Sequence, residues 1–217
     1  MEKLILSQLP DIFVPVAEIF AQKKEELCDM DAKMGDGDLG LTMDKGYGAL
    51  PNILRENLSE GDFGKVLMKS GMKMASIVPS TMGTLMSSGL MGAGKELKGK
   101  IELVPSDFAL FYHGFAEGIA KRGKCTVGDR TIYDALYSAA KKVNERLTNN
   151  PNLSFIEISE IALIGAAEGV EATKCMIPKF GKAAVFSAKA NGIADQGAVA
   201  VYYLLVGIHN YFAYKEQ

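Results

Sequence analysis

The chain has 217 residues, of which 48% are hydrophobic and 23% are charged, a balance typical of a globular protein with a sizeable core. Its 24 basic and 26 acidic residues give a formal net charge of -2. This charge lacks the basic excess that binding along a nucleic-acid backbone requires, so nucleic acid is not expected as a direct partner.

The cysteines and the N-terminal segment indicate where the protein resides. Cys28, Cys125 and Cys175 lie far apart and form no C-x-x-C pair, which favours a reduced setting. The first residues meet Pro10 and Pro15 before any apolar run long enough for a signal peptide, and no later segment is apolar enough to span a membrane. The sequence therefore predicts a soluble cytoplasmic protein without a membrane partner.

Apolar residues recur at three- and four-residue steps along most of the chain, which is a helical period. We predict eight helices, at residues 7–29, 40–56, 62–78, 82–98, 106–122, 130–147, 155–172 and 195–214. The segment 173–194 holds one Pro, two Gly and no sustained helical stripe, so we predict a long loop there. No repeat or linker interrupts the pattern, and the sequence predicts one all-α domain over residues 1–217.

The most informative stretch lies between the first two predicted helices, where residues 29–40 contain four carboxylates and three glycines. Like charges at this density need a counter-ion, and magnesium is usually held by a few carboxylates together with substrate phosphates. Gly35 and Gly37 let the chain turn sharply enough to bring Asp31, Asp36 and Asp38 together. The pattern predicts a magnesium site, with helix capping by the same acids as the alternative.

A calcium-binding EF-hand is excluded by position. Its loop needs acidic or amide residues at positions one, three and five and a Glu at position twelve. A loop starting at Asp36 has Gly40 fifth and Tyr47 twelfth, and one starting at Asp29 has Lys33 fifth. Neither register works.

A second pattern competes for a phosphate-binding role. Residues 89–96 match a P-loop except at the last position, where Glu96 replaces the Ser or Thr that binds magnesium. The preceding residues 84–88 continue a helical pattern, whereas a P-loop follows a buried strand. We interpret the match as accidental. Close helix packing or approach to a ligand better explains the glycines of this region, which are Gly83, Gly89, Gly92 and Gly94.

Two later motifs follow the acidic loop. They are Arg122-Gly123-Lys124 with Gly128-Asp129-Arg130-Thr131, and the turn Ala194-Asp195-Gln196-Gly197-Ala198. With these three motifs in order, the chain resembles, over nearly its whole length, the nucleotide-binding (DhaL-type, DAK2-like) subunit of dihydroxyacetone kinase. The resemblance implies an eight-helix antiparallel up-down barrel with ADP or ATP at one end. Two Mg²⁺ ions would hold the phosphates on Asp31, Asp36 and Asp38.

The resemblance also implies nucleotide contacts on several elements. No side chain is assigned a catalytic role, because phosphoryl transfer asks mainly for positioning and charge neutralisation. The implied nucleotide-binding residues are Leu39, Gly40, Leu41, Thr42, Thr81, Met82, Gly83, Gly123, Ile132, Lys182, Asp195, Gln196 and Gly197.

Members of this family work with partners. The resemblance implies a separate subunit that binds a short keto-sugar substrate, and a phosphoryl-carrier subunit of the phosphotransferase system that recharges ADP, although other members use free ATP. Self-association into a homodimer is left open.

The chain departs from the family pattern around an intact acidic triad. Leu39 stands where His is usual, Thr42 where Asn is common, Met82 where Ser is common, Lys182 where Arg is common and Gln196 where Pro is usual. An Arg-to-Lys change loses a bidentate contact, and Leu offers no hydrogen bond. A nucleotide-binding regulatory module that has lost phosphoryl transfer is therefore the alternative function.

Overall fold

The computed structural model describes residues 1–185, 187 and 190–216. Its long helices are α1 (Leu9–Gln22), α3 (Leu39–Asn57), α4 (Phe63–Ile77), α5 (Thr81–Glu96), α6 (Asp107–Gly123), α7 (Ile132–Asn149), α8 (Phe155–Thr173) and α10 (Gln196–Lys215). The shorter elements are α2 (Lys24–Ala32), α9 (Gly181–Val185), the 3-10 turns η1 (Leu6–Gln8) and η2 (Leu58–Glu60), and the antiparallel two-residue strands β1 (Leu4–Ile5) and β2 (Glu102–Leu103).

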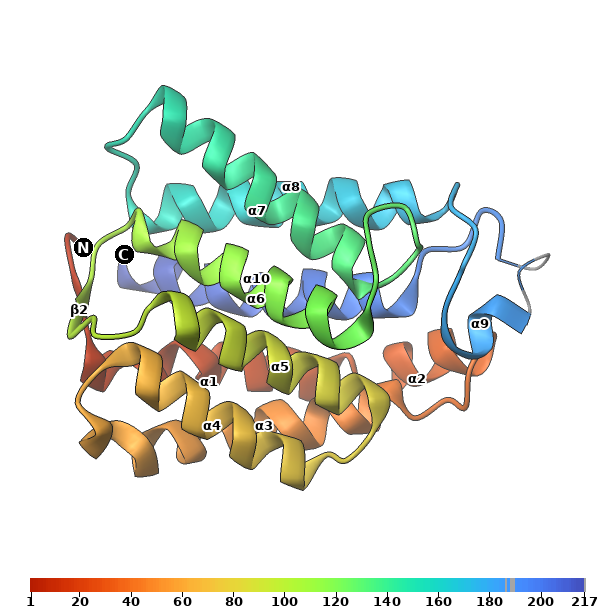
Figure 1. The fold of residues 1–217 in the computed structure, drawn as a ribbon, viewed down its shortest axis with the longest axis horizontal. Helices are drawn as coiled ribbons and strands as arrows, with labels where there is room; N and C mark the ends of the chain where they lie inside the picture. Colours follow the sequence, from red (N-terminus) through yellow and green to blue (C-terminus); the bar gives the residue numbers. More distant parts are fainter. Residues whose placement is uncertain (186, 188–189, 217) are drawn as a thin grey trace.

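The long helices lie side by side along the long axis of the molecule (Figure 1), and their contacts close into a ring. Each contacts the next long helix along the chain, and α10 returns to contact both α8 and α1. Short connections between most of them make neighbouring helices antiparallel. The predicted all-α, up-down barrel is therefore confirmed, with its eight long helices near the predicted positions. None of the described helices is long and apolar enough to cross a membrane.

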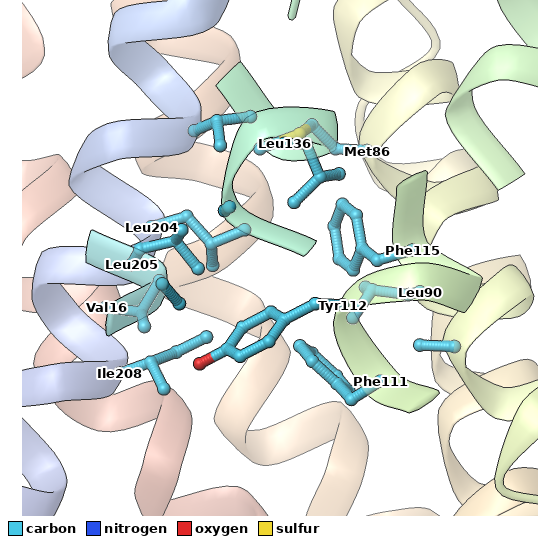
Figure 2. Close-up of a cluster of buried hydrophobic side chains, with 14 of the residues drawn as sticks. Val16, Met86, Leu90, Phe111, Tyr112, Phe115, Leu136, Leu204, Leu205 and Ile208 are labelled. Atoms are coloured by element: carbon cyan, nitrogen blue, oxygen red, sulfur yellow. The ribbon is translucent and has the colours of Figure 1, made fainter. Parts of the chain in front are cut away.

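Apolar side chains from the helices fill the inside of the ring. Removing a large apolar side chain from water contributes roughly 1.5–3 kcal/mol, so this continuous core is the main source of stability. Figure 2 shows its centre, where the labelled side chains point toward one another: Val16, Met86, Leu90, Phe111, Tyr112, Phe115, Leu136, Leu204, Leu205 and Ile208.

Glycines let α4, α5 and α6 approach closely. A Cβ at Gly64 would lie 2.5 Å from the carbonyl oxygen of Gly94, and one at Gly114 would lie 2.6 Å from that of Gly92. All of residues 89–96 lie inside α5. The interpretation of the P-loop match as accidental is therefore confirmed, and these glycines serve helix packing.

Two predictions of secondary structure were wrong, one at residues 7–29 and one at residues 173–194. The helix predicted at 7–29 is divided at Lys23 into α1 and α2. Because α2 buries only Leu27 and Asp31, it lacks the apolar face of a barrel helix, and it packs on the first turn of α3, where Gly40 leaves room for the carbonyl of Lys24.

The segment predicted as a long loop contains the short helix α9. Gly181, the first residue of α9, has a φ of +66°, and a left-handed φ is favourable for glycine. Ala183 and Ala190 pack with Met34 in a small buried cluster separate from the barrel core. This contact between distant parts of the chain holds α9 over the acidic loop.

The close helix contact predicts a large difference between two glycine substitutions. Gly114→Ala meets backbone atoms of α5, so we expect it to lower the free energy of unfolding by about 1–3 kcal/mol. Gly48→Ala, in α3, meets nothing within 4 Å, and should be neutral or stabilise by up to about 1 kcal/mol. Urea unfolding followed by circular dichroism measures both. Equal effects would contradict the packing role.

Candidate functional site

Four long helices begin at the same end of the barrel, at the right of Figure 1. Their N-cap residues are Asp38 for α3, Ser80 for α5, Thr131 for α7 and Asp195 for α10. Each helix N-terminus carries a partial positive charge of about half an elementary charge and unpaired backbone N–H groups. This end of the barrel therefore favours anionic groups.

The acidic loop between α2 and α3 lies at this end. Asp31, in the last turn of α2, is buried, and its Oδ2 accepts hydrogen bonds from the backbone N–H groups of Gly37 (2.9 Å) and Asp38 (3.1 Å). A Cβ at Gly35 would overlap the Asp31 carboxylate, and Gly37 has a φ of +75°. Both glycines are therefore needed for the turn that the sequence predicted.

Helix capping does not explain the three acids. Asp38 is the N-cap residue of α3, but its side chain accepts no capping hydrogen bond. Asp31 binds loop N–H groups, and Asp36 is exposed and paired with Lys182. The side chains of these acids therefore make no capping hydrogen bond to α3, and of the alternative only their interaction with the helix dipole remains.

The geometry of the three acids fits a hard divalent cation. One carboxylate oxygen from each of Asp31, Asp36 and Asp38 lies within 4.8 Å of the others. Opposite oxygens on one magnesium ion are about 4.2 Å apart, given Mg–O distances of about 2.1 Å. Small rotations of the exposed Asp36 and Asp38 side chains would bring the set to that spacing. All three ligands are oxygens, the type that magnesium prefers.

Charge around the triad is partly compensated by Lys182 in α9, whose Nζ lies 2.9 Å from Oδ2 of Asp36. This hydrogen bond lowers the pKa of Asp36. Desolvation, and then the neighbouring charges of Asp36 and Asp31, raise the pKa of Asp38. The ammonium group marks a position where a cation is electrostatically favoured.

A cavity of about 290 Å³ opens beside the triad. It joins residues from the starts of all four helices with residues of the 173–194 segment. A neighbouring cavity of about 520 Å³ includes Gly123 and shares Thr81 and Ile132 with it. The predicted residues that line the first cavity are Asp31, Asp36, Leu39, Thr81, Met82, Ile132, Lys182, Asp195, Gln196 and Gly197.

The remaining predicted nucleotide residues do not line either cavity. Gly40 faces α2, and Leu41 is exposed. Thr42 is buried, with its Oγ1 3.3 Å from Oγ of Ser80, and Gly83 donates its N–H to the same Oγ at 3.0 Å. The contact between Thr42 and Ser80 joins the starts of α3 and α5, so this side of the site is held from behind the cavity wall.

Arg130 is a cavity residue to which the sequence pattern assigned no role. Its side chain is fully buried, its Nη2 donates to the carbonyl of Ile193 at 2.9 Å, and its Nη1 lies 3.7 Å from Oδ1 of Asp195. Its φ of +57° is rare for a residue with a side chain and often marks a functional site. The motif around residue 130 was the only sequence signal, because both partners lie more than sixty residues away.

Asp195 caps α10 by accepting a hydrogen bond from the N–H of Ala198 at 2.9 Å. Burial raises the pKa of Asp195 to about 6, against the lowering effects of that N–H and of the Arg130 guanidinium. Its own N–H donates to Oγ1 of Thr173, at the end of α8. The start of α10 is thus tied to the end of α8 and to the loop before α7.

Comparisons with known proteins agree with this architecture. The DAK2 domain family matches residues 33–210. The chain is 25% identical over 199 residues to the ADP-binding subunit DhaL of the PEP-dependent dihydroxyacetone kinase of Escherichia coli K12, covering 92% of this chain and 93% of that protein. It is 27% identical to the DhaL subunit of dihydroxyacetone kinase 2 of Listeria innocua, covering 86% of each.

A solved structure shares the fold. The dihydroxyacetone kinase of C. freundii, in complex with AMP-PNP and Mg²⁺, superposes with a TM-score of 0.66 at 23% identity. The match covers 93% of this chain and 33% of that one, so the C. freundii chain contains other parts as well. The family match covers most of the barrel, and this chain belongs to the DAK2 domain family.

Proposed function

We propose that this chain is the ADP- or ATP-binding subunit of a dihydroxyacetone-type kinase. Nucleotide held through two Mg²⁺ ions on Asp31, Asp36 and Asp38 gives its phosphate to a short keto-sugar bound on a separate substrate subunit. A carrier subunit of the phosphotransferase system then recharges ADP. The observation that carries the proposal is a cluster of three carboxylates beside one cavity, which Asp31 and Asp36 line together with residues from four helix N-termini.

The electrostatics of the site suit a polyphosphate. The helix N-termini attract phosphate oxygens, whereas the carboxylates repel them unless divalent cations lie between. Bound Mg²⁺ would supply charge neutralisation on the phosphates, which is the main demand of phosphoryl transfer. The chain itself needs only to position the nucleotide, in agreement with the absence of an assigned catalytic side chain.

The neighbouring cavity offers room for the rest of the nucleotide. It extends from Thr81 and Ile132, which it shares with the first cavity, to Gly123 and Cys125. Apolar side chains such as Leu85 and Ile132 can pack against the face of a base. We place the adenine and ribose there, and the phosphates beside the triad.

The rim of this end suits a protein partner. Large apolar side chains are exposed in the first turn of α3, in the loop before α7 and in the segment around α9: Leu41, Val127, Ile177, Phe180 and Val185. Exposed apolar groups gathered near a site often mark an interaction surface. The relatives named ADP-binding subunits of PEP-dependent kinases support a partner of this kind and the carrier-dependent source of phosphate.

Removing the exposed metal ligands tests the metal assignment. Asp36→Ala and Asp38→Ala should each weaken Mg²⁺-dependent ADP binding by about 100-fold or more, because loss of groups that merely orient a ligand already costs 10–100-fold. Titration calorimetry measures the change. Asp29→Ala removes an exposed acid of the same stretch that lies outside the triad, and should bind as the parent does. If the Asp36 and Asp38 variants also match the parent, the assignment is wrong.

Rephosphorylation of bound ADP tests whether the chain acts as a kinase subunit. Denaturing the purified protein should release ADP or ATP, identified by chromatography. Incubation of the ADP form with PEP and the phosphotransferase-system carriers should convert bound ADP to ATP, and addition of a substrate subunit and dihydroxyacetone should then consume it.

Bound ADP that no carrier recharges would contradict the carrier-dependent form. If free ATP also gave no transfer in the presence of the substrate subunit, the regulatory module would be the better description. Leu39 and Met82 in the cavity wall, where the family pattern has polar residues, are the observation that favours this second candidate.

A further inference from the structure

A side-chain hydrogen bond joins two of the barrel's distant segments at the candidate metal site. Nε2 of Gln196, the first residue of α10, lies 3.2 Å from Oδ1 of Asp31, in the last turn of α2. The two residues are 165 positions apart in the sequence. The bond exists only because the ring closes α10 against α1 and brings its start to the acidic loop.

The chemistry of the two side chains determines which of them donates the hydrogen bond. An ionised carboxylate only accepts hydrogen bonds, so the amide must present its NH₂ group to Asp31. Oδ2 of Asp31 already accepts from the N–H groups of Gly37 and Asp38. With Gln196 on Oδ1, both carboxylate oxygens are held, and Oδ1, which accepts only this one hydrogen bond among the described residues, keeps a lone pair for a metal ion.

Gln196 extends from a firmly held turn. Asp195 caps α10 and donates its N–H to Thr173. The buried guanidinium of Arg130 lies against Asp195 and binds the carbonyl of Ile193. The backbone before Gln196 is therefore fixed from α8 and from the loop before α7, and the carboxamide can orient Asp31 rather than follow it.

The oxygen of the Gln196 carboxamide lacks a hydrogen-bond donor. Oε1 of Gln196 is buried and has no hydrogen-bond partner among the described residues. A buried acceptor without a donor costs about 1–3 kcal/mol. Gln196 lines the same cavity as Asp31 and Asp36, so a donor on a bound ligand or on its water can meet this requirement.

We propose that Gln196 is a positioning residue for the metal site, which orients the Asp31 carboxylate toward Mg²⁺ through its Nε2. The role rests on the proposed function, since it needs Mg²⁺ on Asp31. It differs from the nucleotide contact that the sequence implied for this position, because Gln196 acts through a metal ligand. Gln196 thus links metal binding to the seating of α10 in the ring.

Direct metal binding tests this role without any activity measurement. Mg²⁺ is titrated into the full-length parent, Gln196→Ala and Gln196→Met with ADP present, while circular dichroism follows thermal unfolding. We expect both variants to bind Mg²⁺ 10–100-fold more weakly, the usual effect of removing a group that orients a metal ligand. Gln196→Met keeps the length of the side chain and should keep the melting temperature of the parent. Gln22→Ala, at the exposed end of α1, is the control and should change neither quantity.

The outcomes separate the two proposals. If the parent binds Mg²⁺ and both Gln196 variants bind it equally well, the positioning role is overturned and the proposed function stands. A lower melting temperature with unchanged Mg²⁺ affinity would likewise assign Gln196 a purely structural part. If the parent itself shows no Mg²⁺-dependent ADP binding, both proposals fail.

Discussion

Repulsion among three carboxylates is the constraint around which this end of the barrel is arranged. Asp31, Asp36 and Asp38 bring their oxygens within 4.8 Å of one another, where like charges destabilise the fold unless positive charge lies nearby. The up-down order of the helices supplies it, because alternate helices begin at the same end and four of them direct positive N-termini at the site. Lys182 adds a full charge from α9. The barrel topology thus supplies part of the positive charge that stabilises the three carboxylates.

Glycine has two separate functions in this chain, and the surroundings distinguish them. In α4, α5 and α6, glycines without side chains let the helix backbones touch, which joins the three helices into one wall. They are Gly64, Gly92, Gly94 and Gly114. In the acidic loop, glycine leaves room for the buried Asp31 carboxylate. A pattern of glycines beside a lysine therefore resembles a phosphate loop although its real function is packing. The candidate site is built instead from acids and helix N-termini.

Much of the fold and of the candidate site could be predicted because the sequence patterns that indicate them are local. Each long helix turns an apolar stripe to the core, so a helical period identified all eight, and the triad was visible because its members lie within eight residues. The break at Lys23 and helix α9 depend on contacts with Gly40 and Met34 from other segments, which no local pattern encodes. For the same reason the role of Arg130 could not be predicted, because its partners Ile193 and Asp195 lie just before α10. The positions of Gly40 and Leu41 off the cavity follow from the helical turn of α3, which directs successive residues to different faces.

The polar groups of the site are unevenly distributed, and the distribution has a physical consequence. At the start of α3 and in α5 the cavity wall includes the apolar side chains of Leu39 and Met82, so the Thr81 hydroxyl and backbone N–H groups are the donors on that side. The ammonium group of Lys182 and the carboxamide of Gln196 lie on the segment between α8 and α10 and at its end. That segment is anchored by the Arg130–Asp195 pair and by the packing of Ala183 on Met34. Loosening these anchors would move Lys182 and Gln196 away from the acids together, so the fold of the barrel and the geometry of the triad are joined at the start of α10.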